Sequence, residues 1–99
     1  MSAHVYLLHA TPALHHARHY CGHTPNGVSA RVEQHRKGTG AHLTRAMVKA
    51  GCTLHVAKTW AFDDTHEARL FERALKDSHR LPDYCPMCMK GRTRQPATT

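Results

Sequence analysis

The sequence predicts a small α/β domain of the α+β type, in which three helices flank a three-stranded, mainly antiparallel sheet in the order β-β-α-α-β-α. Three segments combine short apolar runs or alternation with turn residues at their ends, which is typical of strands. Three others place apolar residues three and four positions apart, which is typical of helices facing a core. The 99 residues are enough for one domain.

The first two strands are expected to form a hairpin. Residues 4–9, His-Val-Tyr-Leu-Leu-His, have the composition of a buried strand, and we expect Thr11-Pro12 to end it. Residues 18–23 predict a second, short strand, followed by a turn at Pro-Asn-Gly, residues 25–27. The sequence between the strands is rich in His, so we expect an unusually long hairpin loop.

Two helices are predicted next. Val28 and Val32 are four residues apart in the segment 28–37, and Gly38 is a typical residue to follow a helix. A Gly-Thr-Gly elbow then leads to a second helix over residues 41–49, which a further Gly ends.

A third strand and a last helix complete the order. Residues 52–62 alternate between apolar and polar side chains before reaching Trp and Phe. Asp64 and Glu67 have the spacing of a helix capping box, with Asp in place of Ser or Thr. We expect this helix to end at Leu81-Pro82.

The charge of the chain favours a polyanionic partner. There are 14 Lys and Arg against 7 Asp and Glu, a net charge of +7, and 11 His. A basic surface attracts nucleic acid, acidic proteins or anionic lipid alike. Nucleic acid is favoured over anionic lipid, since the chain has no basic amphipathic helix with Trp or Phe of the kind that binds membrane surfaces. No apolar run approaches the roughly 20 residues of a membrane span, and no secretion signal is evident, so a soluble, cytoplasmic protein is expected.

Two tyrosines and a glycine stand out in the predicted hairpin. Tyr6 and Tyr20 lie on its two strands, and Gly22 follows Tyr20 by two positions. A strand Tyr usually packs against cross-strand neighbours, and a strand Gly usually marks a bulge or a close approach of backbone. Each residue therefore has an ordinary structural explanation when it is considered alone.

Three polar residues on the predicted helices are further candidates. Arg31 has no acidic residue three or four positions away, and His35 follows one helical turn later on the same face. Glu72 lies in the interior of the last helix, where it cannot be a cap. An exposed pair with Lys76, four residues on, is its ordinary explanation.

Taken together and in this order, these residues resemble the GIY-YIG nuclease family along residues 4–76. The resemblance comprises a strand Tyr, then Tyr20-Cys21-Gly22, a helical Arg with His four positions on, and a Glu within Leu-Phe-Glu-Arg-Ala-Leu. Residues 37–46, Lys-Gly-Thr-Gly-Ala-His-Leu-Thr-Arg-Ala, are similar to the family's Gly-x-Gly-Ala-x-x-Thr-Arg stretch. The first motif departs from the family because His4-Val5-Tyr6 lacks Gly, and the second because Cys21 stands where Ile is usual.

The resemblance implies a divalent-metal-dependent endonuclease that hydrolyses phosphodiester bonds in DNA. Glu72 would bind Mg²⁺ or Mn²⁺, and Arg31 would offset charge on the phosphorane-like transition state. Tyr6 would accept a proton from the attacking water, directly or through a hydrogen-bonded chain, while Tyr20 and His35 would orient the water and the phosphate. The residues that the resemblance places against the substrate are Gly22, Lys37, His42 and Arg45.

Cys85 and Cys88 form a separate Cys-x-x-Cys pattern, which is half of a tetrahedral zinc site. The candidates for the missing ligands are His79 and, from the hairpin loop, His15, His16 or His19. An inert or redox-sensitive thiol pair is the alternative.

Alternation along the second strand places His19 and His23 on one face with Cys21 between them. The cluster of His15, His16, His19 and His23 is a candidate for binding metal or phosphate, but such residues often lie only on a solvated loop.

The expected organisation is a GIY-YIG-like nuclease domain over residues 1–82, a Cys-x-x-Cys segment over 83–90 and a flexible basic tail over 91–99. Two other functions remain open. One is a non-catalytic nucleic-acid-binding module with a zinc-stapled C-terminus, and the other is a His- and Cys-rich metal-handling protein. For the nuclease, a protein partner is a candidate source of target specificity.

Overall fold

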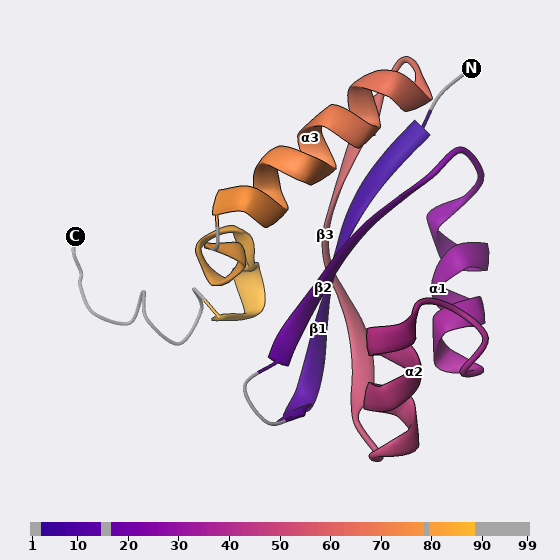
Figure 1. Cartoon of the computed structure of the whole chain (residues 1–99), viewed down its shortest axis with the longest axis vertical. Helices are drawn as coiled ribbons and strands as arrows, with labels where there is room; N and C mark the ends of the chain where they lie inside the picture. The colour runs from indigo at the N-terminus through magenta and orange to yellow at the C-terminus, as the bar shows by residue number, and fades with distance from the viewer. Residues whose placement is uncertain (1–2, 15–16, 79, 89–99) are drawn as a thin grey trace.

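Helices cover both faces of a three-stranded sheet (Figure 1). The computed structural model describes residues 3–14, 17–78 and 80–88. In chain order the elements are β1 (Ala3–Leu14), β2 (Ala17–Thr24), α1 (Val28–Arg36), α2 (His42–Lys49), β3 (Thr53–Phe62), α3 (Thr65–Ser78) and a short 3-10 helix, η1 (Leu81–Tyr84). The predicted order β-β-α-α-β-α is confirmed, with η1 in addition.

The sheet has the strand order β2-β1-β3, and both pairs are antiparallel. The central position of β1 explains its apolar sequence, since a strand paired on both sides and covered on both faces has little contact with water. In the register with β2, Tyr6 lies opposite Gly22 and Leu8 opposite Tyr20. The two tyrosines of the predicted site are thus close neighbours on adjacent strands.

Alternation along β1 divides the apolar residues into two cores. Val5 and Leu7 pack with Ala68 and Leu75 of α3 on one face. Tyr6 and Leu8 belong to the core on the other face, beneath α1 and α2; its further buried members are Ala10, Val32, Met47 and Leu54. Figure 1 shows the same division, with α3 on one side of the sheet and α1 and α2 on the other. A side chain's position in the strand therefore decides which helices it meets.

The prediction that Thr11-Pro12 ends the first strand is wrong. β1 continues to Leu14, which pairs with Ala17 of β2, so the predicted long hairpin loop is wrong as well. Pro12 follows the last residue of β1 that pairs with β3, and it lies in the interval where the pairing with β2 is irregular. Its missing N–H group therefore removes no ladder hydrogen bond, which is the condition under which a strand tolerates Pro.

The helix ends follow the predicted turn chemistry. Gly38 after α1 and Gly51 after α2 have φ angles of 79° and 90°, in the region that favours glycine. The N–H of Glu67 donates to the Asp64 carboxylate at 2.8 Å, which confirms the predicted cap of α3. α3 ends at Ser78, before the predicted Leu81-Pro82, because those residues begin η1. Within the described residues, no helix has the length and apolar character needed to cross a membrane.

Candidate active site

Tyr6 and Tyr20 meet on the face of the sheet beneath α1, with ring centroids 6.3 Å apart. Gly22 makes this arrangement possible. A Cβ atom at Gly22 would lie 2.6 Å from the Tyr6 hydroxyl oxygen and 3.0 Å from Cε2 of Tyr20. The Tyr-x-Gly spacing thus leaves room for the Tyr6 hydroxyl above the backbone of the neighbouring strand.

The Tyr6 hydroxyl begins a buried chain of hydrogen bonds. It lies 2.7 Å from Nε2 of His35, whose Nδ1 lies 2.8 Å from the Thr44 hydroxyl oxygen. The Thr44 hydroxyl donates to the Ala41 carbonyl at 3.0 Å. Because Thr44 uses its proton on that carbonyl, it must accept from His35, so Nδ1 carries the imidazole proton and Nε2 accepts from Tyr6.

Gly40 in the linker allows His35 to occupy this position. A Cβ atom at residue 40 would lie 2.1 Å from Nδ1 of His35, which is too close for any side chain. The stretch similar to Gly-x-Gly-Ala-x-x-Thr-Arg therefore supplies both the space for the imidazole, at Gly40, and its hydrogen-bond partner, at Thr44. Sequence reasoning noted this stretch but assigned no role to either residue.

Arg31 stands one helical turn before His35 and is half-buried. Its Nη1 donates to the Gln34 side-chain oxygen at 2.8 Å. Arg31 also lines a groove, together with His23, Thr24, Pro25, Asn26, Ala30 and Gln34. Its positive charge acts on both Tyr6 and Tyr20. The guanidinium thus places a positive charge in the wall of a groove, close enough to affect both tyrosines.

Glu72 approaches the same tyrosines from α3, on the other side of the edge strand β2. Its side chain is 13% exposed, so it does not extend into bulk water. The imidazole Nδ1 of His23 donates to Oε1 of Glu72, and the Lys76 ammonium lies 2.7 Å from Oε2. The same ammonium lies 5.8 Å from the centre of the Tyr20 ring. The predicted Glu72–Lys76 pair is present, and it stands beside the second tyrosine.

Burial shifts the protonation of the central groups. It raises the pKa of Tyr6 to about 12, against the lowering effect of Arg31, and the Glu72 charge contributes to the rise. Burial likewise raises the pKa of Tyr20. For His35, burial and the Arg31 charge both lower the pKa, so the imidazole is neutral at pH 7. The Tyr6 hydroxyl consequently keeps its proton and faces a neutral acceptor.

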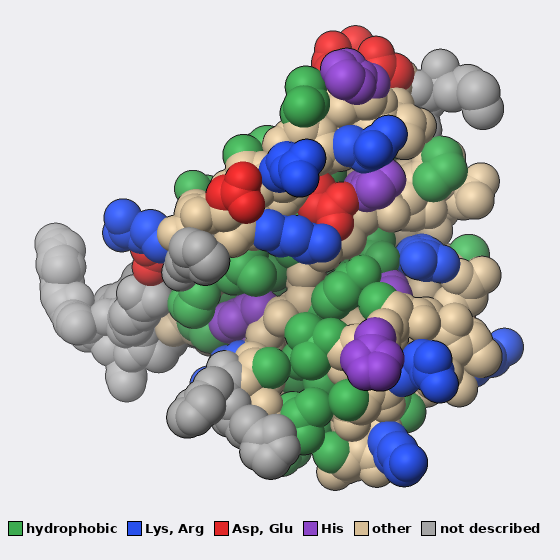
Figure 2. Space-filling view, in the orientation of Figure 1, with side chains coloured by type: hydrophobic (Ala, Val, Ile, Leu, Met, Phe, Trp, Pro, Cys, Tyr) green, Lys and Arg blue, Asp and Glu red, His purple; other side chains and the backbone are tan. Residues whose placement is uncertain are grey.

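The residues expected at the substrate lie apart from this core. Lys37, His42 and Arg45 are exposed on the α1–α2 side, and His42 and Arg45 line a second hollow with Gly38 and Lys49. Figure 2 shows Lys and Arg side chains on the α3 side and on the α1–α2 side of one face, with hydrophobic and His side chains between them. Gly22, in contrast, is buried, and its observed contacts are with the tyrosines.

His23 was a candidate for binding metal or phosphate, but its place beside Glu72 was not predicted from the sequence. The alternation that places His19, Cys21 and His23 on one face of β2 was a usable signal, because α3 packs on that face. Cys21 does belong to the core beneath α3, and His23 reaches Glu72.

Cys85 and Cys88 lie away from these residues, beside His9 and His19. His19 was among the candidate partners and His9 was not. The other candidates, His15, His16 and His79, lie outside the described residues, as does the basic tail over residues 91–99.

Comparison with family models gives a match to the GIY-YIG catalytic domain over residues 3–84. The chain belongs to the GIY-YIG family. The match extends well beyond the motifs, since it includes all three strands of the sheet and all of α3. Searches of curated proteins and of solved structures gave no significant match. The GIY-YIG domain is the catalytic domain of a nuclease family, so the tyrosines, Arg31 and Glu72 lie in a nuclease fold.

Proposed function

We propose that this GIY-YIG protein is a divalent-metal-dependent endonuclease that hydrolyses phosphodiester bonds in DNA. The main support is the chain of hydrogen bonds from Tyr6 through His35 to Thr44, in which the direction of every proton is defined. Any buried tyrosine hydroxyl needs a hydrogen-bond partner, but a neutral imidazole is an acceptor that can also take up the proton. A tyrosine that accepts a proton from water must pass its own proton to a group of this kind.

We propose Glu72 as the carboxylate ligand of the divalent metal on which GIY-YIG nucleases generally depend. Mg²⁺ and Mn²⁺ prefer oxygen ligands and are commonly held by one or two carboxylates together with waters and substrate phosphates. In the structure His23 and Lys76 occupy both oxygens of the Glu72 carboxylate, so a metal ion would take the place of at least one of these partners. When bound there, the ion would polarise the scissile phosphate and stabilise the leaving oxygen.

The buried relay explains how a tyrosine with a raised pKa can serve as a base. As Tyr6 Oη accepts a proton from the attacking water, the hydroxyl passes its own proton to Nε2 of His35. The imidazolium formed keeps its Nδ1 hydrogen bond to Thr44. Tyr6 therefore need not ionise beforehand, which a pKa of about 12 would disfavour at neutral pH. His35 is fully buried, so we propose that it acts through Tyr6 and does not itself touch the water or the phosphate.

Arg31 and Tyr20 have positioning and electrostatic roles in this proposal. Arg31 places positive charge at the rim of the tyrosine pair, where charge would build up on the phosphate during attack. Tyr20 keeps its proton because of its raised pKa, so its hydroxyl can donate to a phosphate oxygen or to the attacking water.

The surface charge supports DNA as the substrate. Arg69, Arg73 and Lys76 line a hollow around Glu72 on α3, and the chain as a whole carries a net charge of +7. Lys37, His42 and Arg45 add positive or protonatable groups on the α1–α2 side. A DNA strand crossing the β2 edge would then meet basic side chains on both sides, and these would contribute affinity without sequence readout.

The decisive experiment is cleavage of supercoiled plasmid with Mg²⁺ or Mn²⁺, with and without EDTA. We expect nicked and linear products that require the metal, a large loss of cleavage for Arg31→Ala, and partial retention for Arg31→Lys, which keeps the charge. Binding is measured in parallel by gel retardation. Metal-insensitive retardation without any cut product would contradict the proposal and would favour a non-catalytic nucleic-acid-binding module.

A further inference from the structure

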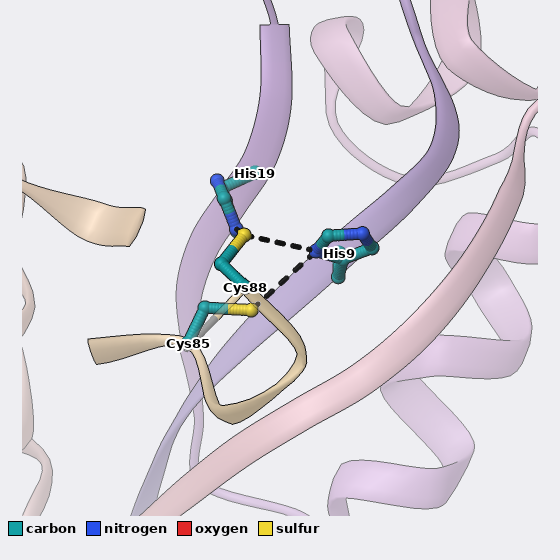
Figure 3. Close-up of side chains that lie close together, drawn as sticks. All are labelled: His9, His19, Cys85 and Cys88. Atoms are coloured by element: carbon teal, nitrogen blue, oxygen red, sulfur yellow. Dashed lines mark hydrogen bonds between the residues drawn. The ribbon is translucent and has the colours of Figure 1, made fainter. Parts of the chain in front are cut away.

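We infer that His9, His19, Cys85 and Cys88 form a structural zinc site that joins the β1–β2 hairpin to the segment after α3. One ligand atom from each residue lies within 4.8 Å of all the others. Figure 3 shows the two sulfur atoms and the two imidazoles directed toward a common centre. This site is distinct from Glu72 and takes no part in the proposed reaction.

The fold places each ligand independently of any metal. His9 and His19 are direct partners in the β1–β2 register, so their side chains leave the same face of adjacent strands. That face is the one beneath α3 and η1. Cys85 follows η1 directly, and a turn in which the Cys88 N–H donates to the Cys85 carbonyl at 3.1 Å brings the second sulfur alongside.

The distances agree with tetrahedral zinc coordination. Zn–S bonds of about 2.3 Å and Zn–N bonds of about 2.0–2.1 Å, at tetrahedral angles, place ligand nitrogen and sulfur atoms about 3.5 Å apart. The Nδ1 atom of His9 lies 3.4 Å from Sγ of Cys85 and 3.6 Å from Sγ of Cys88. The Nε2 atom of His19 lies 3.4 Å from Sγ of Cys88.

Thiol hydrogen bonds alone account poorly for this cluster. Nδ1 of His9 has one lone pair, so it can accept a full hydrogen bond from only one of the two thiols that approach it. Cys85 is fully buried, and its thiol is therefore shielded from water. A cation between the four atoms would use both sulfurs as thiolates and both imidazole lone pairs at once, and two thiolates would balance the charge of Zn²⁺.

The ligand types select zinc and a structural role. Two thiolates with two imidazoles in a tetrahedral arrangement are typical of zinc, whereas Mg²⁺ and Mn²⁺ favour oxygen ligands. Four protein ligands leave no position open for water or substrate, which is the mark of a structural site. In a chain of 99 residues, such a link can supply a substantial part of the folding free energy.

The position of the site connects the zinc to the candidate active site. Its two His ligands stand on the strands that carry Tyr6 and Tyr20, and its two Cys ligands follow the helix that carries Glu72. The cysteines are 69 to 79 residues away from the histidines that they approach. Zinc would thus link the hairpin that carries Tyr6 and Tyr20 to the segment that follows the helix carrying Glu72.

The test uses the whole chain, purified under reducing conditions. We expect native mass spectrometry to show one zinc per chain for the wild type and for Cys52→Ser, a cysteine outside the cluster. Cobalt substitution should give the intense absorption of tetrahedral Co²⁺ together with thiolate-to-cobalt charge-transfer bands. Cys88→His retains a ligand, so it should still bind the metal with weaker charge-transfer bands, whereas Cys88→Ser should lose most of the affinity.

A second readout separates the metal from a general folding defect. A strong chelator should lower the Tm of the wild type and of Cys52→Ser but leave that of folded Cys88→Ser unchanged. Absence of zinc and of charge-transfer bands in the folded, reduced wild type would overturn the inference, as would unaltered zinc content in Cys88→Ser. Should Cys88→Ser fail to fold, the wild-type and Cys88→His spectra decide the matter.

Discussion

The Tyr6 hydroxyl and Nε2 of His35 lie 2.7 Å apart in the interior of the protein, although 29 residues separate them in sequence. This contact connects the first strand of the sheet to the first helix. It also gives the Tyr6 proton a defined destination, because Thr44 fixes the other imidazole nitrogen as a donor. The proposed proton transfer from water through Tyr6 depends on this contact.

The first prediction concerns the hydroxyl of Tyr6. Tyr6→Phe keeps the ring in the core but removes the group that would accept the water proton, so we expect the single-turnover cleavage rate to fall by about 100-fold or more. Stability should change by only about 1 kcal/mol, the size of one buried hydrogen bond. Tyr84→Phe, at a tyrosine that is 41% exposed and outside the site, serves as the control and should cleave normally.

The second prediction separates hydrogen-bond acceptance from proton acceptance at His35. In His35→Gln the amide oxygen can still accept from Tyr6, but it cannot hold a proton at neutral pH. We expect the folded structure and DNA binding to persist while cleavage falls by about 100-fold or more. A variant that cleaves at the wild-type rate would show that the imidazole only positions Tyr6.

The third prediction is a pH dependence of stability that arises from the same histidine. Its pKa is lowered in the folded protein by burial and by Arg31, against about 6.5 when unfolded. The unfolded chain therefore binds the proton first, so the stability is fully present above pH 6.5 and is lost as the pH falls through the folded pKa. Urea unfolding at pH 7.5 and pH 5 should show a larger acid loss in the wild type than in His35→Gln; equal losses would contradict the assignment.

The fourth prediction tests the steric role of two glycines. Gly22→Ala would bring a methyl group against the Tyr6 hydroxyl, and Gly40→Ala would bring one against His35. Each should cost about 1–3 kcal/mol in the free energy of unfolding and should reduce cleavage by displacing the relay. Gly27→Ala is the matched control, because no atom lies within 4 Å of the added carbon. Thermal unfolding measured alongside cleavage distinguishes these outcomes.

Much of the fold followed from local patterns, whereas the site depended on contacts between distant residues. The strand and helix order, the glycine stops after α1 and α2 and the Asp64 cap all arise from neighbouring residues, and all were predicted correctly. The misplaced hairpin loop arose from Pro12, because whether a strand tolerates Pro depends on which of its backbone groups pair with other strands.

The contacts that sequence reasoning missed share one physical feature. His9 meets Cys85 only because η1 returns the chain to the hairpin, and His23 meets Glu72 only because α3 packs on that face of β2. Such neighbours are set by strand register and helix docking, which a linear pattern does not contain. The burial of His35 beneath Gly40 is of the same kind, since it depends on the path of the linker between two helices.

The fifth prediction, and the most direct test of the central claim, compares two glutamates on one helix. Glu72→Gln removes the charge proposed to hold the metal, and Glu67→Gln removes the same charge from the exposed first turn of α3. The measurement is the single-turnover rate of plasmid cleavage at increasing Mg²⁺ concentrations, with DNA binding monitored in parallel. The account predicts that Glu67→Gln cleaves like the wild type, while Glu72→Gln binds DNA but fails to cut it at any Mg²⁺ concentration; equal cleavage by the two variants would contradict it.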